Sequence, residues 1–280
     1  MRENPLISIG IITFNNSISE IKRCLDSIYG QTYNIEQIEI IIRNQGRSRV
    51  LQEIEALIQQ NNWQNIKAYQ GENIGFGKGH NELFSRISPQ SKAYICFNPD
   101  GFWHDEALDH LITMAYINDW NGIFESIQEP IMHPKVFDAH TGVTAWCSGA
   151  CLLIPTTIYK IINGYDEDFF LYCEDVDLSW RVKASGFNCY TCSESYFFHY
   201  AMERQSREQE IWKAASYLAH KWRSDKFKKI ALQQWSKYYD VPESDLEKDI
   251  AALQQHSFEE VKRANPDFHH GLVFSQQMWS

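Results

Sequence analysis

The first hundred residues alternate short apolar strands with amphipathic helices, and this alternation constrains the fold more than any other feature of the chain. Most of the strands are apolar on both faces, which is typical of parallel strands that are covered by helices on each side. The pattern therefore predicts an α/β domain with a mostly parallel central sheet. The predicted strands cover 6–14, 38–42, 66–69 and 94–97, and the predicted helices cover 18–29, 50–60 and 75–87.

Small or polar residues follow each predicted strand, in the segments 13–15, 43–46, 71–79 and 98–101. Ligands of such sheets bind beside the carboxyl ends of the strands, so these segments are predicted to form one continuous rim. Asp100 is well placed to hold Mg²⁺ or Mn²⁺, because these cations prefer oxygen ligands and often bind through one or two carboxylates and substrate phosphates. A Pro-Asp-Gly turn is the alternative interpretation of this segment.

The segment 164–181 carries six carboxylates between Asp166 and Asp177, on both sides of the apolar run Phe169 to Tyr172. A buried element would not tolerate so many unpaired charges. We therefore expect the apolar run to deliver Glu174 and Asp175 to a pocket, where a carboxylate can act as a general base. The alternative is a helix start, where acidic residues complement the helix dipole. Asp177 and Arg181, spaced i and i+4, are predicted to form a structural pair.

Beyond residue 126 the pattern is less regular. The apolar stretch 143–154 is interrupted by Ser148-Gly149-Ala150, whose small side chains would allow either a ligand or a packed neighbour to approach the backbone. His199 ends an aromatic strand, where a lone histidine is usually a satisfied core or surface residue; with a metal at Asp100 it becomes a candidate second ligand. Helices are predicted at 207–234 and 243–261, so the chain is divided into a domain at 1–203 and a C-terminal helical appendage at 204–280.

The composition limits the class of protein. The net charge of −10 argues against nonspecific nucleic-acid binding, which depends on neutralising phosphates. The sequence has no apolar run near the roughly 18 residues of a membrane span and no signal-peptide pattern, and its seven cysteines are typical of reduced thiols in a cytosolic protein. Cys189 and Cys192 are expected in a strand rather than as a redox pair. The basic cluster 221–229 could rest on anionic lipid or form a solvated helix face.

Taken in order, these motifs resemble glycosyltransferase family 2 with the GT-A fold, and within it bacterial rhamnosyltransferases and galactofuranosyltransferases of surface-polysaccharide assembly. The resemblance covers about residues 6–200. One segment departs from it: the second strand usually ends in an acidic residue that contacts the base of the nucleotide, and Arg43 stands there. The matching segments are Ile9 to Asn15, Cys24 to Ile28, Asn73 to Asn81 (N-x-G-F-x-x-G-x-N), Asn98-Pro99-Asp100 at the D-x-D position, Gly164 to Leu178 (G-G-F-D-E…E-D-x-D-L) and His199.

The resemblance implies an enzyme, an inverting hexosyltransferase that uses Mg²⁺ or Mn²⁺. Asp175 is expected to be the general base, Glu174 its neighbour that orients the acceptor or tunes the base, and Asp100 and His199 the metal ligands. The donor half is expected at about 1–101 and the acceptor and catalytic half at about 102–203, and Trp146 is expected either to stack on a sugar or to pack in the core. The residues expected to bind the nucleotide-sugar are Thr13, Phe14, Asn15, Asn44, Asn73, Gly75, Phe76, Gly79, Asn81, Asn98 and Asp100.

The preferred donor on this resemblance is dTDP-rhamnose, and the acceptor is a lipid-linked or growing surface glycan such as O-antigen or capsule. A UDP-sugar donor (galactofuranose, galactose or N-acetylglucosamine) and a non-catalytic glycan-binding subunit with the same fold are the alternatives. The resemblance further implies a cytoplasmic protein whose acceptor lies at the cytoplasmic face of the membrane. The C-terminal helices lie outside the resemblance and could pack on the core, on a second copy of the chain or on lipid, so peripheral contact with the inner membrane and homo-oligomers are both open.

Overall fold

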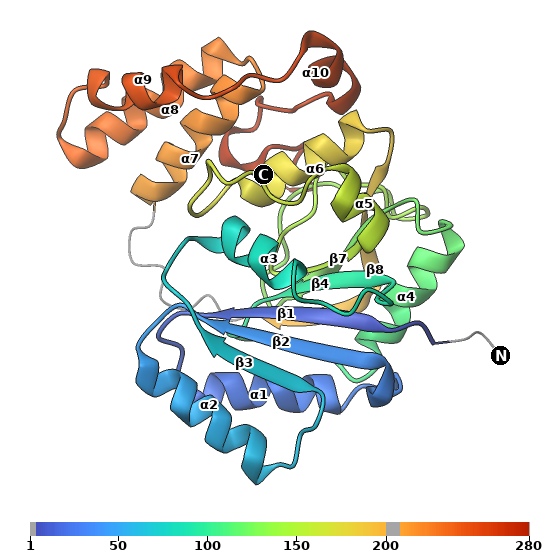
Figure 1. Cartoon of the computed structure of the whole chain (residues 1–280). Helices are drawn as coiled ribbons and strands as arrows, with labels where there is room; N and C mark the ends of the chain where they lie inside the picture. The colour runs from blue at the N-terminus through green and yellow to red at the C-terminus, as the bar shows by residue number, and fades with distance from the viewer. Residues whose placement is uncertain (1–3, 200–207, 280) are drawn as a thin grey trace.

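The computed structural model describes residues 4–199 and 208–279, and within them one curled eight-stranded sheet forms the centre of the molecule (Figure 1). Its spatial order is β3-β2-β1-β4-β7-β6-β8-β5. The strands are β1 (Ile7–Thr13), β2 (Ile38–Asn44), β3 (Ile66–Gln70), β4 (Ala93–Phe97), β5 (Gly101–Trp103), β6 (Gly122–Glu129), β7 (Cys151–Pro155) and β8 (Asn188–His199).

The first half of the sheet is parallel and the second half is mixed. Strands β3, β2, β1 and β4 run parallel, β7 is antiparallel to β4 and β6, and β8 is parallel to β6. The predicted strands of the first hundred residues are all present. The apolar runs of β1, β2 and β4 are buried on both faces as expected, whereas the edge strand β3 is partly exposed. The short β5 pairs antiparallel with β8, with Gly101 opposite His199. This pairing brings the two predicted metal ligands together.

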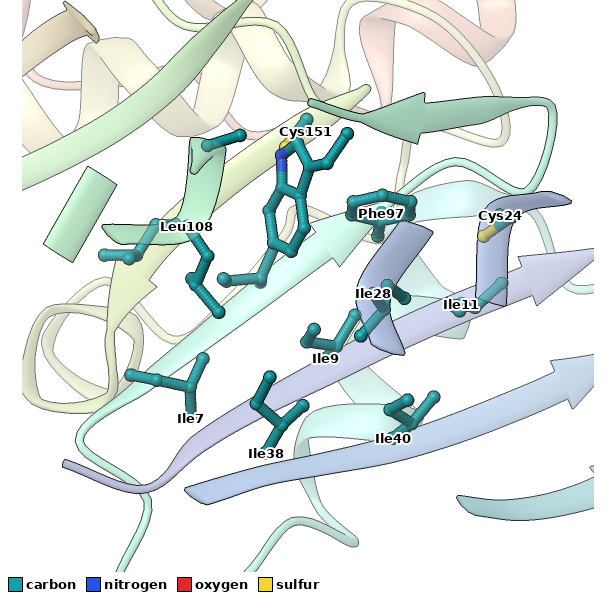
Figure 2. Close-up of a cluster of buried hydrophobic side chains, with 14 of the residues drawn as sticks. Ile7, Ile9, Ile11, Cys24, Ile28, Ile38, Ile40, Phe97, Leu108 and Cys151 are labelled. Carbon is teal, nitrogen blue, oxygen red and sulfur yellow. The ribbon is translucent and has the colours of Figure 1, made fainter. Parts of the chain in front are cut away.

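Helices cover both faces of the sheet and enclose two hydrophobic clusters. Against one face, α1, α2 and α4 pack on isoleucines such as Ile9 and Ile40 (Figure 2). Against the other face lie α3, α5 and α6, which bury Tyr94 and Tyr165 among aliphatic residues. The helices are α1 (Ile18–Tyr29), α2 (Ser48–Gln60), α3 (Phe76–Phe84), α4 (Ala107–Ile117), α5 (Thr156–Ile161) and α6 (Glu174–Ala184).

The C-terminal part contains four shorter helices where two long ones were predicted. The predicted helix 207–234 is interrupted at Trp222 to Ser224, where Arg223 adopts a positive φ of 58°. The predicted helix 243–261 is likewise interrupted, because Ser257 forms the capping box of a new helix. The helices are α7 (Glu208–Lys221), α8 (Asp225–Tyr239), α9 (Ser244–Ala251) and α10 (Phe258–Ala264).

Helices α7, α8 and α10 share a hydrophobic cluster with α6, and α9 packs in a smaller cluster with α8 (Figure 1). Trp180 of α6 packs edge-on against Trp222, with ring centroids 5.5 Å apart. Trp222 Nε1 also donates a hydrogen bond to Asp177 at 2.9 Å, and Asp177 pairs with Arg181 at 2.7 Å as predicted. The predicted domain boundary at residue 203 lies outside the described residues.

The basic cluster of 221–229 is not a uniform surface. Lys221 is buried and donates to Asp166 and Asp168 of the acidic segment, so it faces the protein interior rather than lipid or solvent. Lys226 and Lys229 are exposed. Cys189 and Cys192 lie in β8 as free, buried thiols, as expected. Within residues 4–199 and 208–279, none of the helices has the length and apolar character needed to cross a bilayer.

Candidate active site

A cavity of about 920 Å³ opens at the carboxyl ends of β1 and β4. Phe14 and Asn15 follow β1, and Asn98 and Asp100 follow β4, so the expected rim of polar residues is present on this side. The same cavity is lined by the first turn of α6, which carries Glu174 and Asp175, and by His199 at the end of β8. Its remaining lining residues include Phe76, Gln128, His133, Trp146, Ser148, Gly149, Tyr172, Ile211, Leu272 and Phe274.

Asp100 and His199 form one polar pair in the cavity. His199 Nε2 lies 3.2 Å from Asp100 Oδ1, and Asn98 Nδ2 lies 3.5 Å from the same ring nitrogen. The Pro-Asp-Gly turn and the predicted ligand position are therefore compatible, because the turn between β4 and β5 directs the Asp100 carboxylate toward the end of β8.

The two acids at the start of α6 lie in different environments. Asp175 accepts hydrogen bonds from the Gly149 amide at 3.0 Å and the Val176 amide at 2.8 Å. Glu174 is buried, and its Oε2 atom lacks a hydrogen-bond partner. Both interpretations of this segment hold: a helix begins at Glu174, and its acidic first turn faces a pocket.

Burial is the main cause that raises the pKa of both carboxyls above their ordinary values. For Glu174 the neighbouring charge of Asp175 raises the pKa further, to well above the ordinary range. For Asp175 the Gly149 and Val176 amides and the positive charge of Lys135 oppose the increase. A pair whose environments separate two carboxyl pKa values can divide the roles of base and neutral acid. Asp175 is therefore the carboxyl of the pair that loses its proton more readily, and Glu174 is the one that retains it more strongly.

Asp100 and His199 fit a hard divalent cation only when a bound diphosphate supplies further oxygen ligands. One carboxylate and one imidazole are a suitable donor set for Mn²⁺ or Mg²⁺ when phosphate oxygens complete the shell. Across the part of the chain that the structure describes, no group of three or more His, Cys, Asp or Glu side chains could hold a metal by itself. Asp100 and His199 would therefore hold a cation that a diphosphate also binds.

Thr13 and Asn44 do not line the cavity. Thr13 is fully buried and donates to Asn44 Oδ1 at 2.9 Å. Asn44 Nδ2 donates to Arg47 O and to Gln70 Oε1, at 2.9 and 2.7 Å, and its Oδ1 atom also accepts from the Gly46 amide at 3.3 Å. Because the amide of Asn44 already uses both its donors and its acceptor, these two residues shape the strand ends behind the cavity.

The glycine-rich motif mainly supports the scaffold. Of its predicted ligand-binding residues, only Phe76 lines the cavity. Gly75 has a φ of 89°, and a Cβ atom there would lie 2.3 Å from the carbonyl oxygen of Phe170, so this position requires glycine. A Cβ atom at Gly79 would lie 2.7 Å from Ile12. Asn81 accepts from the Tyr165 amide and Tyr159, and Asn73 accepts from the Gly75 amide.

Arg43 explains how the chain accommodates its departure from the family pattern. The side chain is buried, does not line the cavity and pairs with Glu82 at 2.9 Å. It also donates to Gln45 Oε1 at 2.5 Å and to the Glu72 carbonyl at 2.7 Å. Arg43 thus fixes the loop that precedes α3, and its guanidinium group is engaged within the protein.

Sequence reasoning missed a buried polar group beside the cavity. Lys135 lies in the irregular stretch after β6 and pairs with Glu125 of β6 at 2.6 Å, with both side chains almost fully buried. Its Nζ atom also donates to the Trp146 carbonyl and lies 4.1 Å from the centre of the Trp146 ring. Trp146 is buried and donates to the Val273 carbonyl, so it combines a core position with one face toward the cavity.

Comparisons with known proteins agree with this architecture. The sequence profile of Glycosyl transferase family 2 matches residues 8–172. The chain is 22% identical over 228 residues to Rhamnosyltransferase WbbL of Escherichia coli K12, and the match covers 68% of this chain and 82% of that protein. A 57-residue stretch, 20% of this chain, is 40% identical to 19% of an N-acetylglucosaminyl-diphospho-decaprenol L-rhamnosyltransferase of Mycobacterium tuberculosis.

Solved structures with the same fold include the mannosyltransferase PcManGT from Pyrobaculum calidifontis, in complex with GDP-Man and Mn²⁺. Its TM-score is 0.62 at 14% identity, over 94% of this chain and 86% of that one. S. aureus TarS 1-349 in complex with UDP-GlcNAc has a TM-score of 0.60 at 14% identity, over 84% of this chain and 71% of that one. At these identities the likenesses show a shared GT-A fold.

Proposed function

This chain belongs to glycosyltransferase family 2, and we propose that it is a metal-dependent inverting transferase that moves L-rhamnose from dTDP-rhamnose to a hydroxyl group of a surface glycan. The observation that carries the proposal is the cavity itself, which is lined by Asp175 and by the Asp100–His199 pair. A base and a diphosphate-binding pair that share one cavity are the two requirements of direct glycosyl transfer. The rhamnosyl assignment is supported by the likeness to rhamnosyltransferases.

In the proposed reaction, the acceptor hydroxyl attacks the anomeric carbon from the face opposite the diphosphate. Asp175 takes the hydroxyl proton while the new glycosidic bond forms and the bond to the diphosphate oxygen breaks, so the anomeric configuration inverts. The Gly149 and Val176 amides hold the Asp175 carboxylate in place. When bound, the metal neutralises charge that develops on the diphosphate. Asp100 and His199 would hold it.

The nucleoside side of the cavity is formed by Phe14 and Asn15. Phe14 follows β1 and is 54% exposed, so its ring is available for stacking on a base. The acceptor side is formed by Trp146 and, from the C-terminal helices and tail, by Ile211 and Leu272. We propose that these apolar walls receive a lipid-linked or growing glycan at the cytoplasmic face of the membrane.

The proposal predicts nucleoside diphosphate release that depends on both the donor and the metal. Purified protein is incubated with dTDP-rhamnose, UDP-galactose, UDP-galactofuranose, UDP-N-acetylglucosamine or GDP-mannose, with Mn²⁺ or with EDTA. Release is expected with dTDP-rhamnose and Mn²⁺, and EDTA is expected to abolish it. Thermal shift with each donor runs in parallel, because turnover without acceptor is slow. The absence of both turnover and metal-dependent stabilisation with every donor would contradict the transferase proposal. Such a result would favour a non-catalytic glycan-binding subunit.

The raised pKa of Asp175 predicts an acid limb in the pH profile. Activity is expected to fall with acidification at a pH above the titration range of an ordinary aspartate, because burial favours the protonated carboxyl, which cannot act as a base. The limb belongs to the coupled Glu174–Asp175 pair. The measurement is kcat/KM against pH; an acid limb at the pH of an exposed aspartate would contradict the assignment.

Folding stability depends on pH with the opposite sign. Because the folded chain binds these protons more tightly than the unfolded chain, the contribution of this pair to the free energy of unfolding falls as pH rises.

A further inference from the structure

Gln128 uses both ends of its side-chain amide at the edge of the cavity. Its nitrogen donates to Ser148 Oγ at 2.8 Å, and its oxygen lies 3.2 Å from Nδ1 of His199. The residue lies near the end of β6, beside the point where the register between β6 and β8 shifts. Such irregularities re-aim side chains next to active sites. Gln128 therefore joins the metal-side histidine to the turn that contacts Asp175.

The hydrogen bond to Nδ1 matters because a histidine binds metal through an unprotonated nitrogen. Nε2 is the ring nitrogen that faces Asp100, at 3.2 Å. For Nε2 to bind a cation, the single proton of the neutral ring must reside on Nδ1 and needs an acceptor there. The Gln128 amide oxygen is that acceptor, and a partner of this kind orients the ring and raises its basicity.

The position of Gln128 is itself fixed from the protein interior. Ser148 donates its backbone amide to Glu125 Oε2 at 2.6 Å, and Glu125 is held by the buried Lys135. The next residue, Gly149, donates its amide to Asp175. Glu125 thus anchors the Ser148-Gly149 turn. The turn presents the Ser148 hydroxyl to Gln128 and the Gly149 amide to Asp175.

We propose that Gln128 is a positioning residue for the metal site. It fixes His199 with its proton on Nδ1 and with the Nε2 lone pair toward Asp100. The inference rests on the proposed function, because it requires a cation at Asp100 and His199. It assigns to Gln128 an effect on metal affinity, separate from donor recognition and from the proton transfer at Asp175.

The test is Mn²⁺ affinity, measured by electron paramagnetic resonance of free Mn²⁺ in the presence of dTDP. Gln128→Met keeps the length of the side chain but removes the amide, and we expect it to weaken Mn²⁺ binding by roughly 10- to 100-fold. Gln128→Glu keeps an acceptor for Nδ1–H and is expected to bind Mn²⁺ close to wild type. Gln128→Asn, which is too short to bridge both partners, serves as the second weakened variant if the methionine variant does not fold.

The matched control is Gln233→Met on the exposed side of α8, which makes the same chemical change away from the cavity and is expected to leave Mn²⁺ affinity unchanged. Thermal melting confirms that each variant is folded. If the wild type binds no Mn²⁺ with dTDP, the proposed metal pair is wrong and this inference fails with it. If the wild type binds Mn²⁺ and a folded Gln128→Met or Gln128→Asn variant binds equally well, the role of Gln128 alone is overturned.

Discussion

Replacing Asp175 by asparagine is expected to lower kcat by about 10²- to 10⁴-fold while the protein still folds. The rate falls because asparagine cannot take the proton from the hydroxyl group of the acceptor glycan. Two effects on stability oppose each other. Burial disfavours the charged form of this carboxyl, so removing the charge relieves a cost of folding. Asparagine, however, has one acceptor oxygen in place of the two that receive the Gly149 and Val176 amides. The measurement is nucleoside diphosphate release under saturating dTDP-rhamnose and Mn²⁺, together with thermal melting.

Glu174→Gln is the matched control for this variant. Glu174 has a strongly raised pKa because it is buried beside Asp175, so glutamine resembles its protonated form in shape and charge. We expect Glu174→Gln to retain most of the activity. Equal losses in the two variants would contradict the division of roles between the carboxyls, and a larger loss in Glu174→Gln would reverse it.

The sequence predicted the elements of the site that depend on local pattern. Asp100 follows a buried strand and Asp175 lies in a distinctive acidic segment, so both could be assigned to the cavity from short stretches of sequence. The pairing of Asp100 with His199 depends on β5 folding back beside β8. The family resemblance supplied that long-range contact, which neither segment specifies by itself.

The residues that sequence reasoning missed or misplaced are fixed by contacts between distant segments. Lys221 belongs to a basic cluster in the sequence, but Asp166 and Asp168, more than fifty positions earlier, draw it into the interior. Arg43 was recognised as a departure from the family, but its direction depends on Glu82 and the Glu72 carbonyl. No periodicity or motif encodes such partners, so the sequence indicates the unusual residue without its orientation.

Removing one partner of the buried Glu125–Lys135 pair is expected to cause a large loss of stability near the site. Lys135→Met leaves the Glu125 carboxylate buried without its counter-charge, and breaking a buried pair in this way costs about 3–5 kcal/mol. The side chains of the pair are only 3% and 4% exposed, so water cannot replace the lost partner. Such a loss is a large fraction of the roughly 5–15 kcal/mol that stabilises a typical domain.

The double variant Glu125→Gln/Lys135→Met separates the charge from the packing. Glutamine can still accept the Ser148 amide and remain near Thr191, both of which hydrogen-bond to Glu125. Without a buried charge, the double variant is expected to recover much of the free energy of unfolding that Lys135→Met loses, because a buried ion pair gains little over neutral groups of similar volume. Urea unfolding of the three proteins measures both differences. If Lys135→Met lowers the free energy of unfolding by less than about 1 kcal/mol, the loss is within the range of an exposed ion pair. That result would show that Glu125 finds another partner or reaches solvent. The Ser148-Gly149 turn would then not depend on this pair.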